Sequence, residues 1–192
     1  MPAPNPAALE FLLTRRSRPA PTLVSPWPDR AELEPILTAA ARTPDHGKLE
    51  PWRFIVLSRG ALARLADLVA EIGTARGRDP AEIAKLADHF DRSGRAVVVV
   101  ESPKSSDKIP AIEQTYSAGA VCLALLNAAL AAGWGANWLS GWASHDREFM
   151  RRGLGLADHE RIAGIIHVGT ESSPPPDRPR PDLSAITEWV EA

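Results

Sequence analysis

The sequence is poor in cysteine and in net charge, and each shortage excludes a class of protein. Of its 192 residues only Cys122 is a cysteine, so no intrachain disulfide can form, which suits a reducing cytoplasm. The formal net charge is -2, and no stripe of Lys and Arg with interleaved aromatic residues argues for nucleic acid. The 44% hydrophobic and 24% charged residues are ordinary for a globular protein. We therefore expect one cytoplasmic domain covering residues 1–192.

The familiar catalytic and metal-binding motifs are also missing. The five histidines are scattered, and no two lie at ligand spacing on one helix, so we predict no metal site. Neither the G-x-S-x-G elbow of hydrolases nor a glycine-rich phosphate loop occurs. The N-terminus lacks the basic and apolar regions of a secretory signal. The sequence therefore does not indicate a metalloenzyme, a hydrolase with a serine elbow or an enzyme with a glycine-rich phosphate loop.

One long uncharged stretch could be mistaken for a membrane span. Residues 118–139 read AGAVCLALLNAALAAGWGANWL, but they are rich in alanine and include Asn127 and several glycines. A helix that is apolar all round in this way is more typical of a protein core or a subunit interface. We predict a central buried helix that does not enter a membrane and that could press against another subunit.

Capping signals and apolar periodicity predict a chain of helices and strands. Helix starts are indicated by Asn5 before Pro6, by Asp29 with Glu32, by Asp79 before Pro80 and by Ser144. The predicted helices cover 6–14, 30 to just before Pro44, a segment around 62–72, 80–90, 111–132 and 145–152, with one short helix in the tail. Strands are predicted at 53–58, 96–100 and 161–170, with a short strand or strand-like turn at 135–141. This order indicates an α/β or α+β sheet with helices on both faces.

The segment RTPDHGKLEPWRFIVLS, residues 42–58, combines two kinds of sequence. Its end, FIVLS, is an apolar run that predicts a buried strand. Before it lies a loop stiffened by Pro44 and Pro51 and crowded with ionisable side chains. Such a loop is either a solvated connection or a ligand-binding one. Asp45 and Glu50 fit a structural role, for example orienting His46 and Arg53.

Three further motifs combine groups that bind anions or stack on rings. The triplet Arg15-Arg16-Ser17 could hold a phosphate, or could simply close a helix with basic residues. Arg178 and Arg180, on a proline-rich frame, could close over the same anion or belong to a solvated tail. In NWLSGW, residues 137–142, the two tryptophans are either core residues or a platform for a planar ligand.

Taken together and in this order, these motifs resemble the nitroreductase family, in particular its small YdjA-like branch. The resemblance rests on RRS, PDHGKLEPWRF, KIPAIEQTYSAGA, GWGANWLSGW and HVGT, and it spans roughly residues 9–183. It implies an α+β sandwich with a central, mostly antiparallel sheet and helices on both faces. It further implies an intertwined homodimer with FMN bound at the subunit interface, and ping-pong transfer of a hydride from NAD(P)H to a second substrate.

The resemblance also implies which residues contact the cofactors. Those matched to FMN are Arg15, Arg16 and Ser17 (phosphate and ribityl chain), Arg42 and His46, and Trp138, Leu139 and Ser140 after the long helix. Arg178 and Arg180 match a basic pair aimed at the phosphate. The segment matched to the pyridine nucleotide is Ala128, Ala129, Leu130, Ala131, Ala132 and Gly133. No catalytic acid or base is predicted, because hydride transfer depends on positioning.

The expected function is therefore an FMN-dependent oxidoreductase that passes a hydride from NAD(P)H to a small nitroaromatic, quinone or similar acceptor. The alternative is a flavin-binding protein of the same fold without NAD(P)H turnover. A dimeric scaffold that has lost the flavin is a third reading, which the intact RRS and PDH motifs disfavour.

Overall fold

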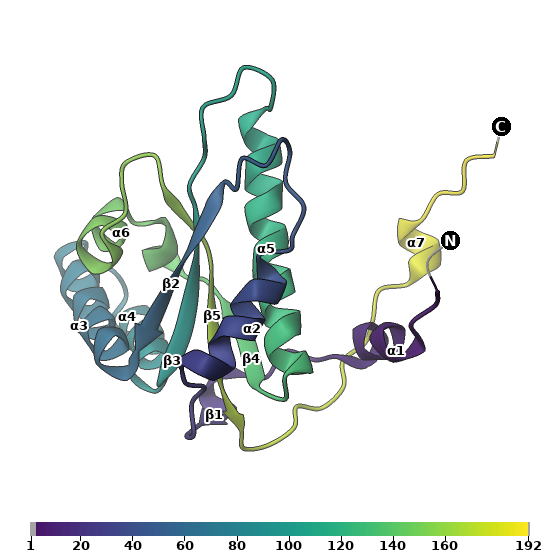
Figure 1. Ribbon diagram of the computed structural model, residues 1–192. Coiled ribbons are helices and arrows are strands. Elements are labelled where there is room, and N and C mark those ends of the chain that lie inside the picture. Colours follow the sequence, from purple (N-terminus) through teal and green to yellow (C-terminus); the bar gives the residue numbers. More distant parts are fainter. Residues whose placement is uncertain (1–2, 192) are drawn as a thin grey trace.

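The computed structural model, which describes residues 3–191, places an antiparallel sheet between two layers of helices (Figure 1). The strand order is β1-β5-β3-β2, and β4 also pairs with β5. The strands are β1 (Leu23–Val24), β2 (Trp52–Ser58), β3 (Arg95–Glu101), β4 (Gly135–Leu139) and β5 (Arg161–Glu171). Strand β5 contacts three of the other four and is the centre of the sheet. The predicted α+β sandwich with an antiparallel sheet is confirmed.

The helices begin largely where local capping chemistry predicts. They are α1 (Pro6–Thr14), α2 (Arg30–Ala40), α3 (Arg59–Ala75), α4 (Pro80–Asp91), α5 (Ala111–Ala131), α6 (Arg147–Leu154) and α7 (Leu183–Ile186). Asn5 and Asp79 each accept a hydrogen bond from the first turn, and Asp29 forms a full capping box with Glu32. The start predicted at Ser144 is wrong, because α6 is capped by Asp146, which accepts from the Phe149 N–H at 2.9 Å. Ser144 lies in a 3₁₀ turn, Trp142–His145.

Strand β3 explains why the sheet needs cover on both faces. Ala96, Val98 and Val100 face a cluster formed with α3, α4 and α6, while Val97 and Val99 face a cluster formed with α2 and α5. All five side chains are fully buried. Burial of each valine side chain stabilises the fold by roughly 1.5–3 kcal/mol relative to leaving it exposed. A continuous apolar run is therefore typical of a strand that is covered by helices on both faces.

Helix α5 packs along the sheet as predicted for the uncharged stretch. By length and composition it could cross a membrane, but Val121, Cys122 and Leu125 are fully buried against β3, β4 and β5. Cys122 is thus a small core residue, and burial raises its pKa to about 12. The opposite side of the helix carries exposed apolar side chains, of which Ile112 is 52% and Tyr116 68% exposed.

Two features of the sheet differ from the sequence reading. The run FIVLS belongs to β2, which lies at the edge of the sheet, so Leu57 is buried but Val56 is 43% exposed. The prediction of a buried strand holds only in part: Phe54 and Ile55 are half-buried, one against each core cluster, and β2 has a neighbouring strand on one side only. The two-residue strand β1 was not predicted, since it exists only through its pairing with Thr170 and Glu171.

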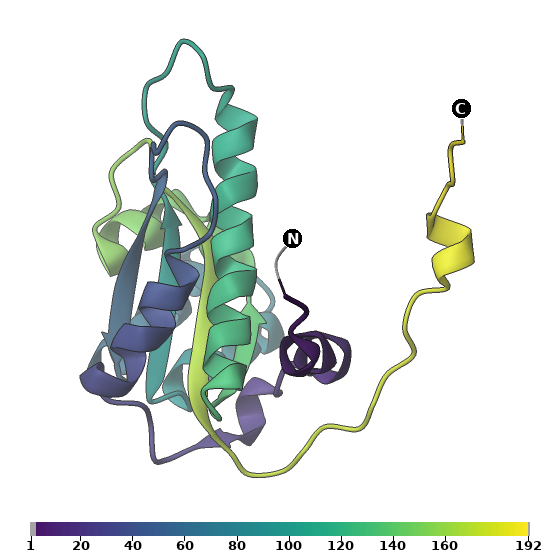
Figure 2. The ribbon, with the colours of Figure 1, turned by 45° about the vertical axis from the view of Figure 1, so that its right-hand side comes forward.

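Both ends of the chain extend from the body of the molecule. Helix α1 has no buried residue, and Leu9, Leu12 and Leu13 are each more than half exposed. The segment after β5 runs clear of the sheet and carries α7 with it, as Figures 1 and 2 show from two directions. Near its end Trp189 and Val190 are each 86% exposed. These two arms leave apolar side chains without a partner within residues 3–191.

Candidate flavin-binding site

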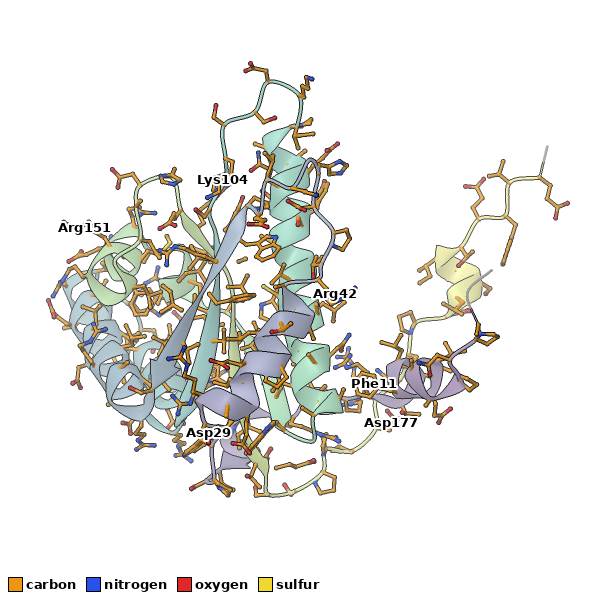
Figure 3. All side chains as sticks on the ribbon, in the orientation of Figure 1. Phe11, Asp29, Arg42, Lys104, Arg151 and Asp177 are labelled. Carbon is orange, nitrogen blue, oxygen red and sulfur yellow. The ribbon has the colours of Figure 1, made fainter. Side chains whose placement is uncertain are left out.

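The two arms meet at a small hollow rich in arginine. It has a volume of about 120 Å³ and is lined by Arg15, Arg16, Ser17, Arg178 and Arg180, which we call the arginine hollow. Figure 3 labels Phe11 of α1 and Asp177 of the C-terminal segment close to this meeting point. The structure therefore brings together two motifs that are some 160 residues apart in the sequence.

The arginine hollow has more positive charge than its own carboxylate can offset. Asp177 is the acidic side chain there: it lies 3.6 Å from Arg16 Nη1 and 3.4 Å from Arg180 Nη2. Burial lowers the pKa of Arg15, and the charges of Arg180, Arg16 and Arg18 lower it further. Arg15 Nε and Arg16 Nη1 are buried without a hydrogen-bond partner. A bound anion would supply both the missing charge and the missing acceptors.

The RRS triplet is held in place by strand β4. The Arg18 N–H donates to the Ala136 carbonyl at 2.8 Å, and Asn137 Nδ2 donates to the Arg18 carbonyl at 2.8 Å. The Arg18 side chain forms an ion pair with Glu171 at 3.1 Å. Since Arg18 is thus engaged, it anchors the triplet while Arg15 and Ser17, hydrogen-bonded to each other at 3.1 Å, face the hollow.

A larger cavity continues from the arginine hollow and shares Arg15 and Ser17 with it. Its volume is about 510 Å³, and we call it the central cavity. The other lining residues come from the ends of β4, β5 and α5 and from the 3₁₀ turn: Leu123, Leu126, Trp138, Ser140, Ser144, His145, Ile162, Ala163 and Gly164. A cavity with both apolar and polar walls beside an arginine-rich hollow can hold a planar group with a phosphorylated side chain.

The shape of the central cavity depends on a gap in the sheet. Strand β4 ends at Leu139, opposite Ile165, so within the described chain residues 161–164 of β5 have only β3 beside them. Ala163 is an extra residue in the β3–β5 register, a bulge of the kind found next to active sites. A Cβ on Gly164 would lie 2.3 Å from Trp138 Nε1, so the tryptophan ring can lie against the strand only because this residue is glycine.

Arg42 and His46 lie elsewhere in the same chain. His46 borders a hollow of about 540 Å³ on the N-terminal half of α5, and its Nε2 lies 3.3 Å from Glu113 Oε2. Arg42 follows the end of α2 (Figure 3). Neither residue lines the arginine hollow or the central cavity. A single chain therefore does not join these two predicted contacts to the others.

The loop that carries His46 is rigidly tied to α5. Lys48 and Glu50 have positive φ values of 56° and 47°, which non-glycine residues seldom adopt. Asp45 stabilises this turn by accepting the Glu50 N–H at 2.6 Å, and Ser117 donates to the Pro44 carbonyl at 3.0 Å. Arg53 pairs with Glu160 through two hydrogen bonds of 2.7 and 2.8 Å. Asp45 is thus structural, as expected, but its hydrogen bond goes to Glu50, while His46 pairs with Glu113. Glu50 does not orient Arg53, which pairs with Glu160.

The remaining predicted residues divide between the site and its surroundings. Trp138 and Ser140 line the central cavity, and Leu139 lies between them in the chain. Residues Ala128–Gly133 form the last turn of α5 and the bend after it, and none of them lines a hollow described above. Among residues 3–191 no cluster of three or more metal-ligating side chains occurs.

Sequence reasoning missed the contributions of β5 and of the 3₁₀ turn, chiefly Ala163, Gly164, Ser144 and His145. One signal was present: Gly164 interrupts the apolar run of a core strand, and a glycine at such a position often marks a close approach of another group. His145 carried no local signal.

The comparisons with known proteins agree with this geometry. The sequence profile of the nitroreductase family matches residues 24–170. YdjA of Escherichia coli K12, named provisionally as an NAD(P)H nitroreductase, is 34% identical over 163 residues, covering 85% of this chain and 87% of YdjA. A protein from Haemophilus influenzae with the same provisional name is 32% identical over 165 residues, covering 85% of this chain and 88% of its own.

Solved structures show the same fold. A nitroreductase-like family protein from Bacillus cereus superposes with a TM-score of 0.79 at 24% identity over 100% of both chains. A protein from Desulfovibrio desulfuricans, solved in complex with FMN, superposes with a TM-score of 0.72 at 19% identity, over 99% of this chain and 100% of its own. The solved structures show the fold, and the matched profile together with the two relatives above 30% identity establishes that the chain belongs to the nitroreductase family.

Proposed function

We propose that the protein is an FMN-dependent oxidoreductase that takes a hydride from NAD(P)H and passes it, by a ping-pong mechanism, to a nitroaromatic, quinone or similar small acceptor. The observation that carries this proposal is the arginine hollow opening into the central cavity. The excess of guanidinium groups suits a phosphate. The cavity beside it combines apolar side chains such as Leu126, Trp138 and Ile162 with polar ones, which suits a flavin ring with its apolar and polar edges. The FMN complex of the Desulfovibrio desulfuricans protein of the same fold supports this assignment.

We assign the phosphate to Arg15, Arg16 and Ser17 together with Arg178 and Arg180. A dianion bound between them would accept hydrogen bonds from the buried Arg15 Nε and Arg16 Nη1, which have no hydrogen-bond partner, and would offset the repulsion among the arginines. Trp138, Leu139 and Ser140 lie where the end of β4 would meet the edge of the ring. Bound FMN supplies the two-electron chemistry. The chain itself supplies binding, orientation and exclusion of water, and we assign it no catalytic acid or base.

We further propose a homodimer in which Arg42 and His46 of one chain complete the site of the other. The exposed apolar side of α5, the uncovered α1 and the extended C-terminal arm are surfaces that a second copy would cover. The loop that carries His46 is held in a strained turn, and it places His46 away from the central cavity of its own chain. This placement also fits a site shared between subunits. The pyridine-nucleotide assignment for Ala128, Ala129, Leu130, Ala131, Ala132 and Gly133 remains part of this proposal.

We propose that residues 1–192 act as one flavin-binding domain in the cytoplasm. The unpaired Cys122, buried with a raised pKa, is stable as a thiol and needs no oxidising compartment. Reduced pyridine nucleotides and small organic acceptors are then the partners, with no nucleic acid or membrane involved.

The first test is the visible spectrum of the purified protein, followed by anaerobic titration with NADPH and then NADH. A bound flavin that one nucleotide bleaches, and that one equivalent of a quinone or no more than one equivalent of a nitroaromatic restores, is the expected result. A yellow protein that neither nucleotide bleaches would instead indicate flavin binding without turnover. A colourless protein that takes up no added FMN would overturn the cofactor assignment and the function together.

A further inference from the structure

A second cavity adjoins the central cavity on the side away from the arginine hollow. Its volume is about 350 Å³, and we call it the side cavity. The two cavities share a wall formed by Ser144, His145, Ile162 and Ala163. The side cavity adds residues from four elements: Glu101 of β3, Thr115 and Gly119 of α5, Met150 of α6 and Arg161 of β5. A small molecule in this cavity would lie next to whatever the central cavity holds.

The exposed charged side chain in the side cavity is that of Arg161, which is held by Glu101. Arg161 lies opposite Glu101 in the β3–β5 register, and its Nη2 donates to Glu101 Oε1 at 3.0 Å. The Glu101 side chain is 6% exposed and that of Arg161 is 61% exposed, so an entering ligand meets the guanidinium first. Thr115 Oγ1 also donates to Glu101 Oε1, at 2.6 Å. The carboxylate is thereby engaged from two sides and holds the arginine in position.

The same arginine retains unused hydrogen-bonding capacity. Apart from the bond to Glu101, its guanidinium donates no side-chain hydrogen bond to any residue within 3–191. A guanidinium has five N–H groups in a planar fork that matches a carboxylate in two places at once. His145, on the shared wall, adds a ring that can donate a further hydrogen bond. The side cavity thus combines a pre-positioned cation with the mostly apolar surroundings of Met150, Ile162 and Ala163.

We propose that the side cavity binds the second substrate and that Arg161 selects acceptors carrying an acidic group, such as a carboxylate on the aromatic ring. This inference rests on the proposed function, because it takes the central cavity to be the flavin site. The acidic group would pair with Arg161 while the reducible part of the molecule lies across the wall at His145, Ile162 and Ala163. The selection is electrostatic, so it weakens as ionic strength rises.

The test uses the FMN-reconstituted protein in its oxidised form and isothermal titration calorimetry with two probes, 4-nitrobenzoate and 4-nitrobenzyl alcohol. These probes share the nitroaromatic ring and differ in the charged group. Wild type is expected to bind the nitrobenzoate about tenfold more tightly, the scale of one charge-assisted hydrogen-bonded contact at a partly exposed site. Arg161→Gln is expected to bring the two Kd values within about twofold, and Arg161→Lys to keep part of the preference.

The matched control is Arg151→Gln, which removes the same charge from the exposed surface of α6 and lines neither cavity (Figure 3). It is expected to keep the tenfold preference. Equal Kd values for the two probes in wild type would overturn the proposal even if Arg161→Gln failed to fold, and so would a preference that survives in a folded Arg161→Gln. The measurement needs no nucleotide, so a protein that selects the nitrobenzoate yet is not reduced by NAD(P)H would fail the proposed function alone.

Discussion

At the scale of the residue, the unusual feature is a shortage of anions around Arg15. Its Nε is buried and unpaired, its nearest charged neighbours are other arginines, and the nearby Asp177 is shared between Arg16 and Arg180. Unpaired buried donors cost free energy, so this group destabilises the protein without a ligand. The same groups become favourable when a phosphate accepts their hydrogen bonds, so under the proposed assignment the affinity for FMN depends strongly on them.

Arg15→Ala is therefore expected to raise the Kd for FMN by about 10- to 100-fold, the range for one lost hydrogen bond to a charged group. The double change Arg15→Ala with Ser17→Ala is expected to yield protein that purifies without flavin. Fluorescence titration of the apoprotein with FMN measures both. The control is Arg92→Ala, since Arg92 pairs with Asp88 on α4 and lines neither the arginine hollow nor the central cavity. Retention of wild-type affinity in the double variant would contradict the phosphate assignment.

At the scale of the element, the close contact of β4 with β5 shapes the central cavity. Trp138 lies against the bare backbone of Gly164, and Cys122 of α5 stands behind it, 2.9 Å from where a Cβ would be. The Cβ of an alanine at position 164 would therefore displace either the Trp138 ring or Cys122 on α5. Such overpacking typically costs 1–3 kcal/mol.

Gly164→Ala is accordingly expected to lower the free energy of unfolding by about 1–3 kcal/mol and to shift Trp138, which changes the tryptophan fluorescence and weakens FMN binding. Urea unfolding followed by fluorescence gives the first quantity, and FMN titration gives the second. Gly60→Ala in α3 serves as the control: a Cβ there meets nothing within 4 Å, and alanine favours the helix. An unchanged emission spectrum together with unchanged stability in Gly164→Ala would show that the contact is not tight.

The elements differ in how far the sequence predicts them. The starts of α1, α2 and α4 were predictable because the capping residue and the N–H groups it satisfies are adjacent in sequence. At α6 two candidate caps, Ser144 and Asp146, lie two residues apart, and the choice between them depends on the 3₁₀ turn that occupies the first. Strand β1 was not predictable, because two residues form a strand only when a distant partner is present.

The candidate site also combines features that local sequence predicts with features that depend on tertiary structure. The RRS triplet and Arg178 with Arg180 could each be recognised from their residue types, but their meeting depends on the path of the chain after β5. The separation of Arg42 and His46 from the central cavity was equally invisible, since proximity in the sequence says nothing about which side of α5 a loop faces. Arg161 and His145 entered only through tertiary structure, because neither belongs to a local motif.

At the scale of the whole molecule, a buried histidine links stability to pH. His167 in β5 is 1% exposed, its ring packs 6.1 Å from that of Phe90, and its Nδ1 has no hydrogen-bond partner. Burial, with a smaller contribution from the neighbouring charge of His89, lowers its pKa to about 4. The folded protein therefore keeps His167 neutral over a pH range in which the unfolded chain already binds a proton.

We expect acid to destabilise the protein between about pH 6.5 and pH 4. Above pH 6.5 both states are neutral at His167; below it the unfolded state binds the proton more tightly, so the free energy of unfolding falls by up to about 3 kcal/mol. His167→Gln removes this group, and its stability should fall less steeply with acidity than that of wild type. Urea unfolding at intervals from pH 7.5 to 4 measures the difference, in which other titrating groups cancel. Parallel curves for the two proteins would contradict the assignment.

The position of β5 in the sheet has a consequence for how the protein is made. This strand, Arg161–Glu171, pairs with β1, β3 and β4, yet it is the last strand in sequence among residues 3–191. During synthesis the ribosome must therefore deliver the chain through β5 before the sheet can close, and until then the valines of β3 lack their central neighbour. The arm that carries Arg178 and Arg180 emerges later still, so the arginine hollow is completed only after the core beside it.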